Sequence, residues 1–389
     1  MNRPAHQVSW TGVLESPPGA EVTLDGKRYI YFAGTAYSAL QGHPAVIKAG
    51  CDAFQRYGVN TATSRSGYGE CPPLLDVEQL VAEYFSAEAA FYFISGYWGN
   101  NLTLSALQPY FDVIFYDEFS HYSILESLKL CDRPSFSFTH RDSIDLETQL
   151  KARLQPGQTP LVISDGIFAS SGRIAPVDQY RQVLAGYPGA CIVLDDAHSI
   201  GILGGGLGTF VHFGIPFADV NRHPDETRSH AAPRFYCSGT LSKACGGSGG
   251  VIVGTSAWIE LVKNSSRYFN AASSPAAPVA AATAMALRLL ATDPGIRDRV
   301  LANAMVLREG LVQLGLVVEL TPVPFLSLVV KDASHMQHMQ RSLRERGLIV
   351  AYARTYSGVG AEGNLRIAVS AAHSIPMIQR LLSEIATLL

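Results

Sequence analysis

Short apolar runs alternate with longer stretches of helical spacing from about residue 91 to residue 253. We assign six of these runs to strands and the stretches between them to helices. Strands and helices that alternate in this way form a mostly parallel sheet with helices on both faces. The pattern therefore predicts an α/β fold. The six predicted strands are residues 91–94, 113–116, 161–164, 191–194, 235–238 and 250–253.

Both ends of the chain depart from this alternation. Residues 22–32 carry two apolar runs around Asp25-Gly26, which predicts a hairpin, and helices are predicted from Pro44 and over 74–85. After Gly254 we expect helices at 275–290, 296–314, 334–346 and 375–388, with strands at 317–320, 325–330, 348–352 and 365–369. We predict an N-terminal segment (1–45), a large domain (46–270) and a small C-terminal α+β domain (271–389).

Composition narrows the class of protein. The chain has 389 residues, of which 47% are hydrophobic and 16% charged, enough apolar material for two domains. A net charge of -3 provides no basic field for nucleic acid. The six cysteines lack metal-binding spacing, residues 1–10 lack a signal pattern, and no run approaches eighteen apolar residues. We expect a cytoplasmic protein without a membrane span or a metal site.

Lys243 lies between small hydroxylated residues and a glycine-rich run, directly after a predicted buried strand. A neutral lysine amine attacks an aldehyde to form an imine, and burial favours the uncharged amine. Thr240 offers a hydroxyl to phosphate oxygens, and glycines let the backbone approach a ligand closely. By itself, this segment is equally compatible with a Gly/Ser turn followed by a solvated lysine.

A second segment, residues 193–201, is predicted to be a strand that ends at Asp195 and Asp196 and is followed by His198. Asp195 could pair with a protonated heterocyclic nitrogen, and His198 could hydrogen-bond a phenolic oxygen. A planar pyridine cofactor with an aldehyde and a phosphate needs these partners and a lysine. A helix N-cap and a satisfied histidine would explain either motif singly but explain the pair poorly. The motifs lie at carboxyl ends of predicted strands, where open sheets bind ligands.

The polar stretch 221–234 contains His223 and His230. Their spacing among Pro, Asp and Arg favours a solvated loop over a metal site, and we assign no site there.

Six groups of residues, in order, resemble those of the α-oxoamine synthases, which are fold type I enzymes dependent on pyridoxal 5'-phosphate. The resemblance covers about residues 31–388. It implies a mostly parallel seven-stranded sheet and a homodimer with active sites at the interface. It also implies condensation of an α-amino acid with an acyl thioester, carried by CoA or a carrier protein, to give an α-aminoketone and carbon dioxide. The groups are Tyr57-Gly58 with Ser64-Arg65 and Gly69, Ser95 to Tyr97, Ser120-His121, Asp195 to His198, Gly239 to Lys243, and Leu365-Arg366 with Ser370 to His373.

The resemblance gives four residues roles at the cofactor ring. Lys243 would hold the aldehyde as an imine (a Schiff base) and then act as general base. Asp195 would keep the ring nitrogen protonated, so that the ring accepts electrons from the carbanion. His198 would hydrogen-bond the phenolic oxygen, and His121 would stack over the ring.

Other residues would hold the phosphate and the substrate. Backbone amides at Ser95-Gly96-Tyr97 are expected at a helix N-terminus, where anions bind. Ser274 would supply a hydroxyl to the phosphate of the neighbouring subunit. Arg366 would grip the substrate carboxylate, a task suited to a planar guanidinium, although a structural salt bridge is an alternative.

Several positions depart from the family pattern. Thr35, expected on the substrate side, stands where asparagine is usual, and Ala169 replaces a serine that contacts the cofactor. Asp165 stands where glutamate is common and Cys71 where histidine is usual, while Trp98 replaces a small residue and would narrow the pocket. These changes leave the amino acid and the acyl donor open.

Three alternatives remain beside the synthase. The first is a lyase, aldolase or aminotransferase on the same scaffold, and the second is a catalytically silent subunit of a heteromeric synthase. The third, a dinucleotide-binding protein built on Gly204 to Gly208, rests on a glycine cluster that does not close a strand directly. We set it aside.

Overall fold

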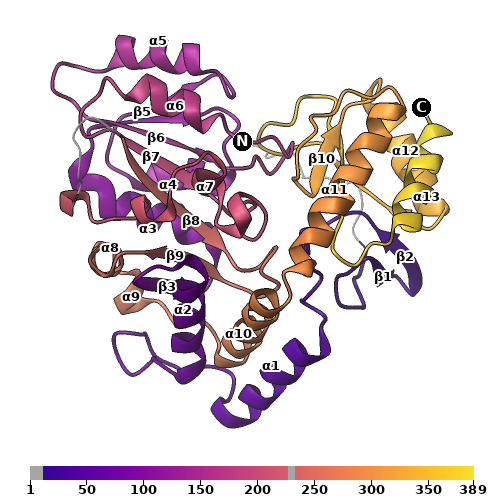
Figure 1. Cartoon of the computed structure of the whole chain (residues 1–389), viewed down its shortest axis with the longest axis horizontal. Helices are drawn as coiled ribbons and strands as arrows, with labels where there is room; N and C mark the ends of the chain where they lie inside the picture. Colours follow the sequence, from indigo (N-terminus) through magenta and orange to yellow (C-terminus); the bar gives the residue numbers. More distant parts are fainter. Residues whose placement is uncertain (1–11, 227–232) are drawn as a thin grey trace, which may run out of the picture.

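A computed structural model describes residues 12–226 and 233–389 (Figure 1). A seven-stranded sheet in the order β3-β9-β8-β7-β6-β4-β5 forms the large domain. Its strands are β3 (Ala89–Phe93), β4 (Val113–Asp117), β5 (Ser135–Phe138), β6 (Pro160–Asp165), β7 (Cys191–Asp195), β8 (Arg234–Thr240) and β9 (Gly250–Gly254).

The strands from β5 to β8 are parallel, and only β9 runs against its neighbours β3 and β8. This confirms the predicted α/β fold with a mostly parallel sheet. Six of the strands coincide with predicted runs to within a few residues. β5 was missed because it lies at the sheet edge, where Ser135 and Ser137 face solvent and only alternate residues are apolar.

Helices cover both faces of the sheet because each buried strand alternates its side chains between two cores. On β7, Ile192 and Leu194 enter one core, whereas Cys191 and Val193 enter the other. The first core is covered by α2 (Pro72–Phe85), α5 (Ser143–Arg153), α6 (Val177–Leu184), α7 (Thr209–His212) and α10 (Ala277–Thr292). The second is covered by α3 (Gly99–Leu107), α4 (Tyr122–Leu130) and α8 (Ser256–Asn264).

The small domain has its own core and two short sheets. One sheet is antiparallel and joins β10 (Phe325–Leu328), β13 (Asn364–Ala368) and β12 (Ala351–Ala353). In the other, the predicted N-terminal hairpin of β1 (Glu21–Leu24) and β2 (Lys27–Tyr31) pairs with β11 (Leu348–Ile349). The covering helices are α11 (Gly295–Gln313), α12 (Ala333–Glu345) and α13 (Ile375–Ala386). The hairpin of β1 and β2 thus packs into the small domain, far from it in the sequence (Figure 1).

The predicted strand at 317–320 is wrong. These residues are irregular, and Val317 is fully exposed. The segment is held as a connection, since Arg308 Nη1 donates to the Glu319 carbonyl at 2.6 Å. Two valines and a leucine resembled a strand, but no neighbouring strand is available for them.

The domain boundaries stay a prediction. α10 packs against α1 (Pro44–Tyr57) and α2, whereas α11 packs against α13.

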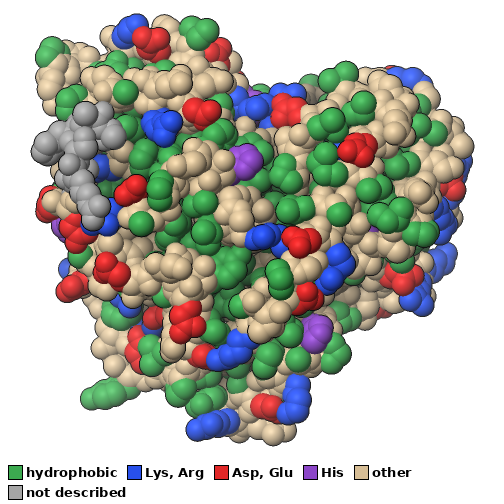
Figure 2. Space-filling model, in the orientation of Figure 1, with side chains coloured by type: hydrophobic (Ala, Val, Ile, Leu, Met, Phe, Trp, Pro, Cys, Tyr) green, Lys and Arg blue, Asp and Glu red, His purple; other side chains and the backbone are tan. Residues whose placement is uncertain are grey.

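Acidic and basic side chains are interspersed over the face drawn in Figure 2. Within the described ranges, 12–226 and 233–389, no helix is long and apolar enough to cross a membrane.

The polar stretch 221–234 begins with a buried residue. Asn221 is inaccessible to solvent and has a φ of 55°, a left-handed conformation that asparagine tolerates. Its amide donates to the carbonyls of Cys237 (2.8 Å) and Val253 (2.7 Å), and its Oδ1 accepts from Cys237 N (2.8 Å). Residues 227–232, His230 among them, lie outside the described part. In the rest of the chain, no cluster of three metal-ligating side chains is present.

Asn221 therefore holds β8 in place just before Lys243, and Asn221→Ala is expected to lower the free energy of unfolding by about 3 kcal/mol. The reason is that buried backbone groups lose their partners while a left-handed residue gains a penalty. Urea denaturation followed by circular dichroism measures this change. Asn264→Ala, at an exposed position of α8, is the control. Equal urea midpoints for Asn221→Ala and Asn264→Ala would contradict this role of Asn221.

Candidate active site

A pocket of about 250 Å³ opens at the carboxyl ends of the central strands. Eight predicted site residues line it, from four separate segments of the chain, and Arg366, Thr35 and Ser274 lie outside it. The lining residues that the sequence did not single out as site residues are Ser123, Asp165, Ala197 and Ser242. The eight are Ser95, Gly96, Tyr97, His121, Asp195, His198, Thr240 and Lys243.

Lys243 follows β8 in a turn that is fixed through its backbone. Its carbonyl accepts from Gly246 N at 3.2 Å and from Gln41 Nε2 at 3.1 Å. Burial lowers the pKa of its ammonium group to about 8, against the opposing charges of Asp195 and Asp165. Roughly a tenth of the side chain is consequently a free amine at pH 7, whereas less than roughly a thousandth of an unburied lysine would be.

Asp195 ends β7 and is held from three directions. Its Oδ2 accepts from Asn100 Nδ2 at 2.7 Å and from Ser123 Oγ at 3.2 Å, and its Oδ1 accepts from Ala197 N at 3.0 Å. These donors fix the carboxylate at the pocket wall, where it can face a cationic group.

His121 is the N-cap of α4, and this position fixes its tautomer. Its Nδ1 accepts from Ser123 N at 3.1 Å, which leaves the proton on Nε2. Its backbone N–H donates to Asp165 Oδ2 at 2.8 Å. Burial lowers the pKa of the imidazole, so the ring is neutral and presents a flat face. Capping thus explains the geometry of His121 and leaves its ring available at the pocket.

His198 is buried and is oriented by Tyr37. The Tyr37 hydroxyl lies 2.9 Å from His198 Nδ1, and burial raises the pKa of Tyr37 to about 12, so the hydroxyl keeps its proton. Because this hydroxyl accepts from Arg366 Nη2 at 3.3 Å, its own proton is left for donation to His198 Nδ1. Burial and the positive charges of Lys243 and Arg366 hold the pKa of His198 well below its usual range. The neutral imidazole therefore carries its proton on Nε2.

Arg366 lies beside the pocket on β13. Its guanidinium donates to the carbonyls of Gly34 (3.0 Å) and Ala169 (3.4 Å) and to the Tyr37 hydroxyl (3.3 Å). It also lies 4.3 Å from the centre of the Phe325 ring. Three of its five N–H groups are thereby engaged by described residues, and two remain for a carboxylate.

Thr35 and Ser274 lie farther from the pocket. The carbonyl of Thr35 accepts from Tyr37 N at 2.9 Å, so this residue supports the segment that carries Tyr37. Ser274 is buried, with its hydroxyl 2.8 Å from Thr61 Oγ1. Trp98 does not line the pocket, and its ring packs 6.1 Å from that of Tyr268, so the narrowing expected from Trp98 is not seen.

The opposite end of the pocket suits an anion. Ser95 caps a short 3₁₀ turn that leads into α3, and its Oγ accepts from Tyr97 N at 3.3 Å. Gly96 packs so closely on Thr240 that a Cβ would lie 2.7 Å from the threonine Cβ. The Thr240 hydroxyl lies 2.8 Å from the Gly249 carbonyl. The Gly96 backbone and the Thr240 side chain are thus brought together at the pocket wall without an intervening side chain.

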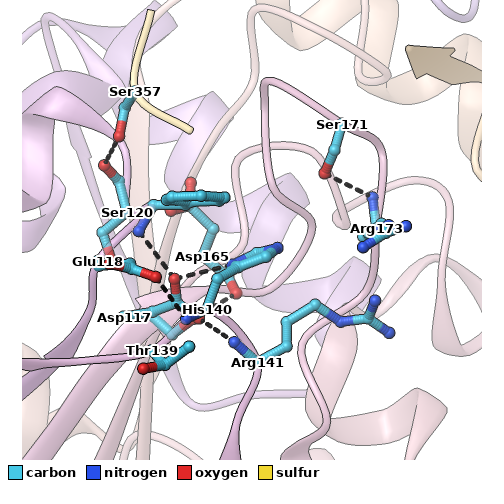
Figure 3. A network of polar contacts seen from close by, with 12 residues as sticks. Asp117, Glu118, Ser120, Thr139, His140, Arg141, Asp165, Ser171, Arg173 and Ser357 are labelled. Atoms are coloured by element: carbon cyan, nitrogen blue, oxygen red, sulfur yellow. Dashed lines mark hydrogen bonds and ion pairs between the residues drawn. The ribbon is translucent and has the colours of Figure 1, made fainter. Parts of the chain in front are cut away.

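Asp165 forms the wall between the pocket and a second polar network (Figure 3). Burial and the charge of Asp195 raise the pKa of its carboxyl well above the usual range. In the adjoining network, Asp117 Oδ1 lies 2.9 Å from His140 Nδ1, and Asp117 Oδ2 accepts from Arg141 N at 2.8 Å. These bonds fix the strand ends on which the Asp165 and His121 backbones rest.

The residues of the pocket fit pyridoxal phosphate. A lysine with a lowered pKa can form an imine with the aldehyde of this cofactor, and the carboxylate of Asp195 can pair with its ring nitrogen. The space between Gly96 and Thr240, which no side chain at position 96 fills, can take its phosphate. When bound, this cofactor supplies a carbonyl that carries an amino acid and a ring that accepts electrons from the α-carbon.

Comparisons with known proteins agree with this assignment. Residues 27–385 match the family model "Aminotransferase class I and II". The chain is 34% identical over 376 residues to the 8-amino-7-oxononanoate synthase of Pseudomonas putida strain GB-1 (96% of this chain, 92% of the relative). It is 32% identical over 378 residues to that of Nitrosococcus oceani (97% and 96%).

Solved structures show the same architecture. A serine palmitoyltransferase from S. paucimobilis, with a bound PLP-myriocin aldimine, has a TM-score of 0.86 and 26% identity, covering 97% of this chain and 92% of that one. The serine palmitoyltransferase of Sphingomonas wittichii has a TM-score of 0.85 and 26% identity, covering 97% and 91%.

The chain belongs to the class I and II aminotransferase family and is a fold type I enzyme dependent on pyridoxal phosphate. Within this class it is an α-oxoamine synthase, an acyltransferase of the decarboxylative condensation type. The predicted family, reaction class and cofactor are confirmed.

The lowered pKa of Lys243 predicts how cofactor capture depends on pH. Because only the free amine reacts, the rate at which cofactor-free protein binds pyridoxal phosphate should rise with pH through about 8 and level off above it. An unburied lysine would be under roughly 1% neutral at pH 8, and its rate would climb until about pH 10. Stopped-flow visible absorbance measures the rate, with Lys129→Ala as the exposed-lysine control. A rate still climbing steeply above pH 9 would contradict the lowered pKa.

Proposed function

We propose that this pocket joins an α-amino acid to an acyl thioester, with Arg366 holding the amino acid's carboxylate and Lys243 as the base. The observation that carries this proposal is the chain of contacts from Arg366 through Tyr37 to His198. This chain of contacts connects the Arg366 guanidinium, which keeps two N–H groups for a ligand, to His198 in the wall of the cofactor pocket. A carboxylate bound there would place the amino acid's α-carbon toward Lys243.

The roles of the other residues follow from their fixed protons. Neutral Lys243 takes the proton from the α-carbon, because burial keeps its amine free. Asp195 would pair with the ring nitrogen of the bound cofactor, and His198 would donate from Nε2 to its phenolic oxygen. His121 would cover the ring with a neutral imidazole. The Ser95–Tyr97 turn and Thr240 would hold the phosphate.

Carbon dioxide release tests this function. Purified protein loaded with pyridoxal phosphate is given a panel of amino acids, each with and without acyl-CoA or acyl-pantetheine thioesters. Release should require both substrates and fall at least a thousandfold in Lys243→Ala, because the base is lost. Lys129→Ala should match the wild type. Lysine-dependent turnover without thioester would replace the synthase with a lyase or aminotransferase.

We also propose that the enzyme is a cytoplasmic homodimer. A groove of about 410 Å³ along α1 and α10 exposes Ile47, Phe54 and Val279, which are 47%, 55% and 41% accessible. It continues to Gly246-Gly247-Ser248 behind Lys243, so a second copy seated there would adjoin the active site. The six free cysteines support a reducing compartment.

In the proposed dimer, Ser274 acts on the partner's phosphate, because its own pocket does not include it. Sedimentation should give about 84 kDa, twice 41.9 kDa. A mixed dimer of Lys243→Ala and Ser274→Ala chains should then keep one fully intact site, in which wild-type Lys243 meets wild-type Ser274. Cofactor titration of the purified mixed dimer should show one site of wild-type affinity. If the mixed dimer showed no site of wild-type affinity, Ser274 would instead contact the phosphate bound by its own chain.

A further inference from the structure

Three tyrosines surround His121 at the outer edge of the pocket, and we call Tyr97, Tyr122 and Tyr356 the tyrosine collar. Their ring centres lie 6.0, 6.3 and 5.9 Å from that of His121. Tyr122 and Tyr356 also meet edge to face at 5.4 Å. Tyr97 and His121 line the pocket, while Tyr122 is 42% exposed, so the collar spans from the pocket to solvent.

Tyr356 closes the collar from the small domain. Tyr356 lies in the connection between β12 and β13. The residue that follows it, Ser357, donates from Oγ to the Ser120 carbonyl at 2.5 Å (Figure 3). Gly358 has a φ of 73°, and a Cβ there would lie 2.9 Å from the Phe119 side chain. The connection is therefore docked onto the loop that carries His121, and the position of Tyr356 is built into the fold.

The collar presents apolar ring faces to a ligand that enters the pocket past it. The Tyr356 hydroxyl makes no hydrogen bond to the described residues, and burial together with the charge of Asp165 raises its pKa to about 12. It is therefore a neutral group under working conditions. Aromatic faces with small gaps between them accept a slender hydrocarbon chain better than a bulky ring.

The rim of the collar carries a negative charge. Glu126 Oε2 accepts from the Tyr97 hydroxyl at 2.5 Å, and this carboxylate has no ion-pair partner among the described residues. A second carboxylate brought to this rim would be repelled, by an energy worth a several-fold change in affinity at a partly exposed site.

The collar lies on the His121 side of the pocket, whereas the proposed carboxylate grip of Arg366 lies on the Tyr37 side. The amino acid and the acyl group must approach the same carbon, and the Tyr37 side is assigned to the amino acid. The collar, which spans from the pocket to solvent, offers the acyl group an approach from the other side.

We propose that Tyr356 and Glu126 determine acyl specificity: the tyrosine collar admits unbranched, uncharged acyl chains and discriminates against bulky acyl groups and those ending in a carboxylate. This inference rests on the proposed function, since it names the acyl class that the same site accepts.

Three eight-carbon acyl groups on pantetheine test the collar: octanoyl, cyclohexylacetyl and octanedioyl. Pantetheine is the arm shared by CoA and carrier proteins, so either natural donor is represented. In Tyr356→Ala the preference for octanoyl over cyclohexylacetyl, as a ratio of kcat/KM values, should fall at least fivefold, whereas Tyr356→Phe should keep it. Glu126→Gln should raise kcat/KM for octanedioyl about fivefold and leave octanoyl within twofold.

Tyr68→Ala, at a position 96% exposed, and Glu309→Gln, on the exposed side of α11, are the matched controls. Calorimetric binding of the unreactive thioether S-octyl-pantetheine gives a readout without turnover, and Tyr356→Ala should weaken it at least threefold. If wild-type protein turns over no thioester while this binding responds to Tyr356, the proposed reaction fails and the collar stands. Unchanged preferences and unchanged thioether binding in Tyr356→Ala would overturn the inference.

Discussion

The chemistry of this protein depends on the burial of Lys243 in the wall of the pocket. An exposed lysine is almost entirely protonated at neutral pH and is a poor nucleophile and base. Here burial lowers the pKa to about 8, even though Asp195 and Asp165 pull it in the opposite direction. Desolvation therefore outweighs the opposing effect of two nearby carboxyl groups.

Asp165 shares this buried environment. Burial and the charge of Asp195 raise the pKa of the Asp165 carboxyl well above its usual range. Two adjacent strands, β6 and β7, end in these acids at paired positions of the sheet. Of the pair, Asp195 is the one whose carboxylate accepts from three donors, so the sheet itself holds this group at the pocket wall.

The sequence was sufficient for the parts of the site that single strands deliver. A strand followed by Asp195 or by Lys243 places that residue at the carboxyl edge of a parallel sheet, so local pattern and fold class together locate it. Asn100 and Ser123 could not be found in this way, because their role depends on α3 and α4 meeting at Asp195. β5 and the irregular 317–320 segment were misjudged for a related reason. Whether each segment forms a strand depends on a neighbouring strand to pair with, and only the folded chain shows where such a strand lies.

Contacts between the domains explain why the small domain belongs to the active site. Tyr37, from the N-terminal segment, joins Arg366 of β13 to His198 after β7, so one hydroxyl connects three distant stretches of chain. Because Tyr37 retains its proton, it can accept from the guanidinium and donate to the imidazole at once. A change in the position of β13 would move Arg366 and reorient His198 together. Substrate grip and cofactor contact are in this way coupled through a neutral hydrogen-bonded link. The link holds between the pKa of His198, which lies well below its usual range, and the pKa of Tyr37, which is about 12.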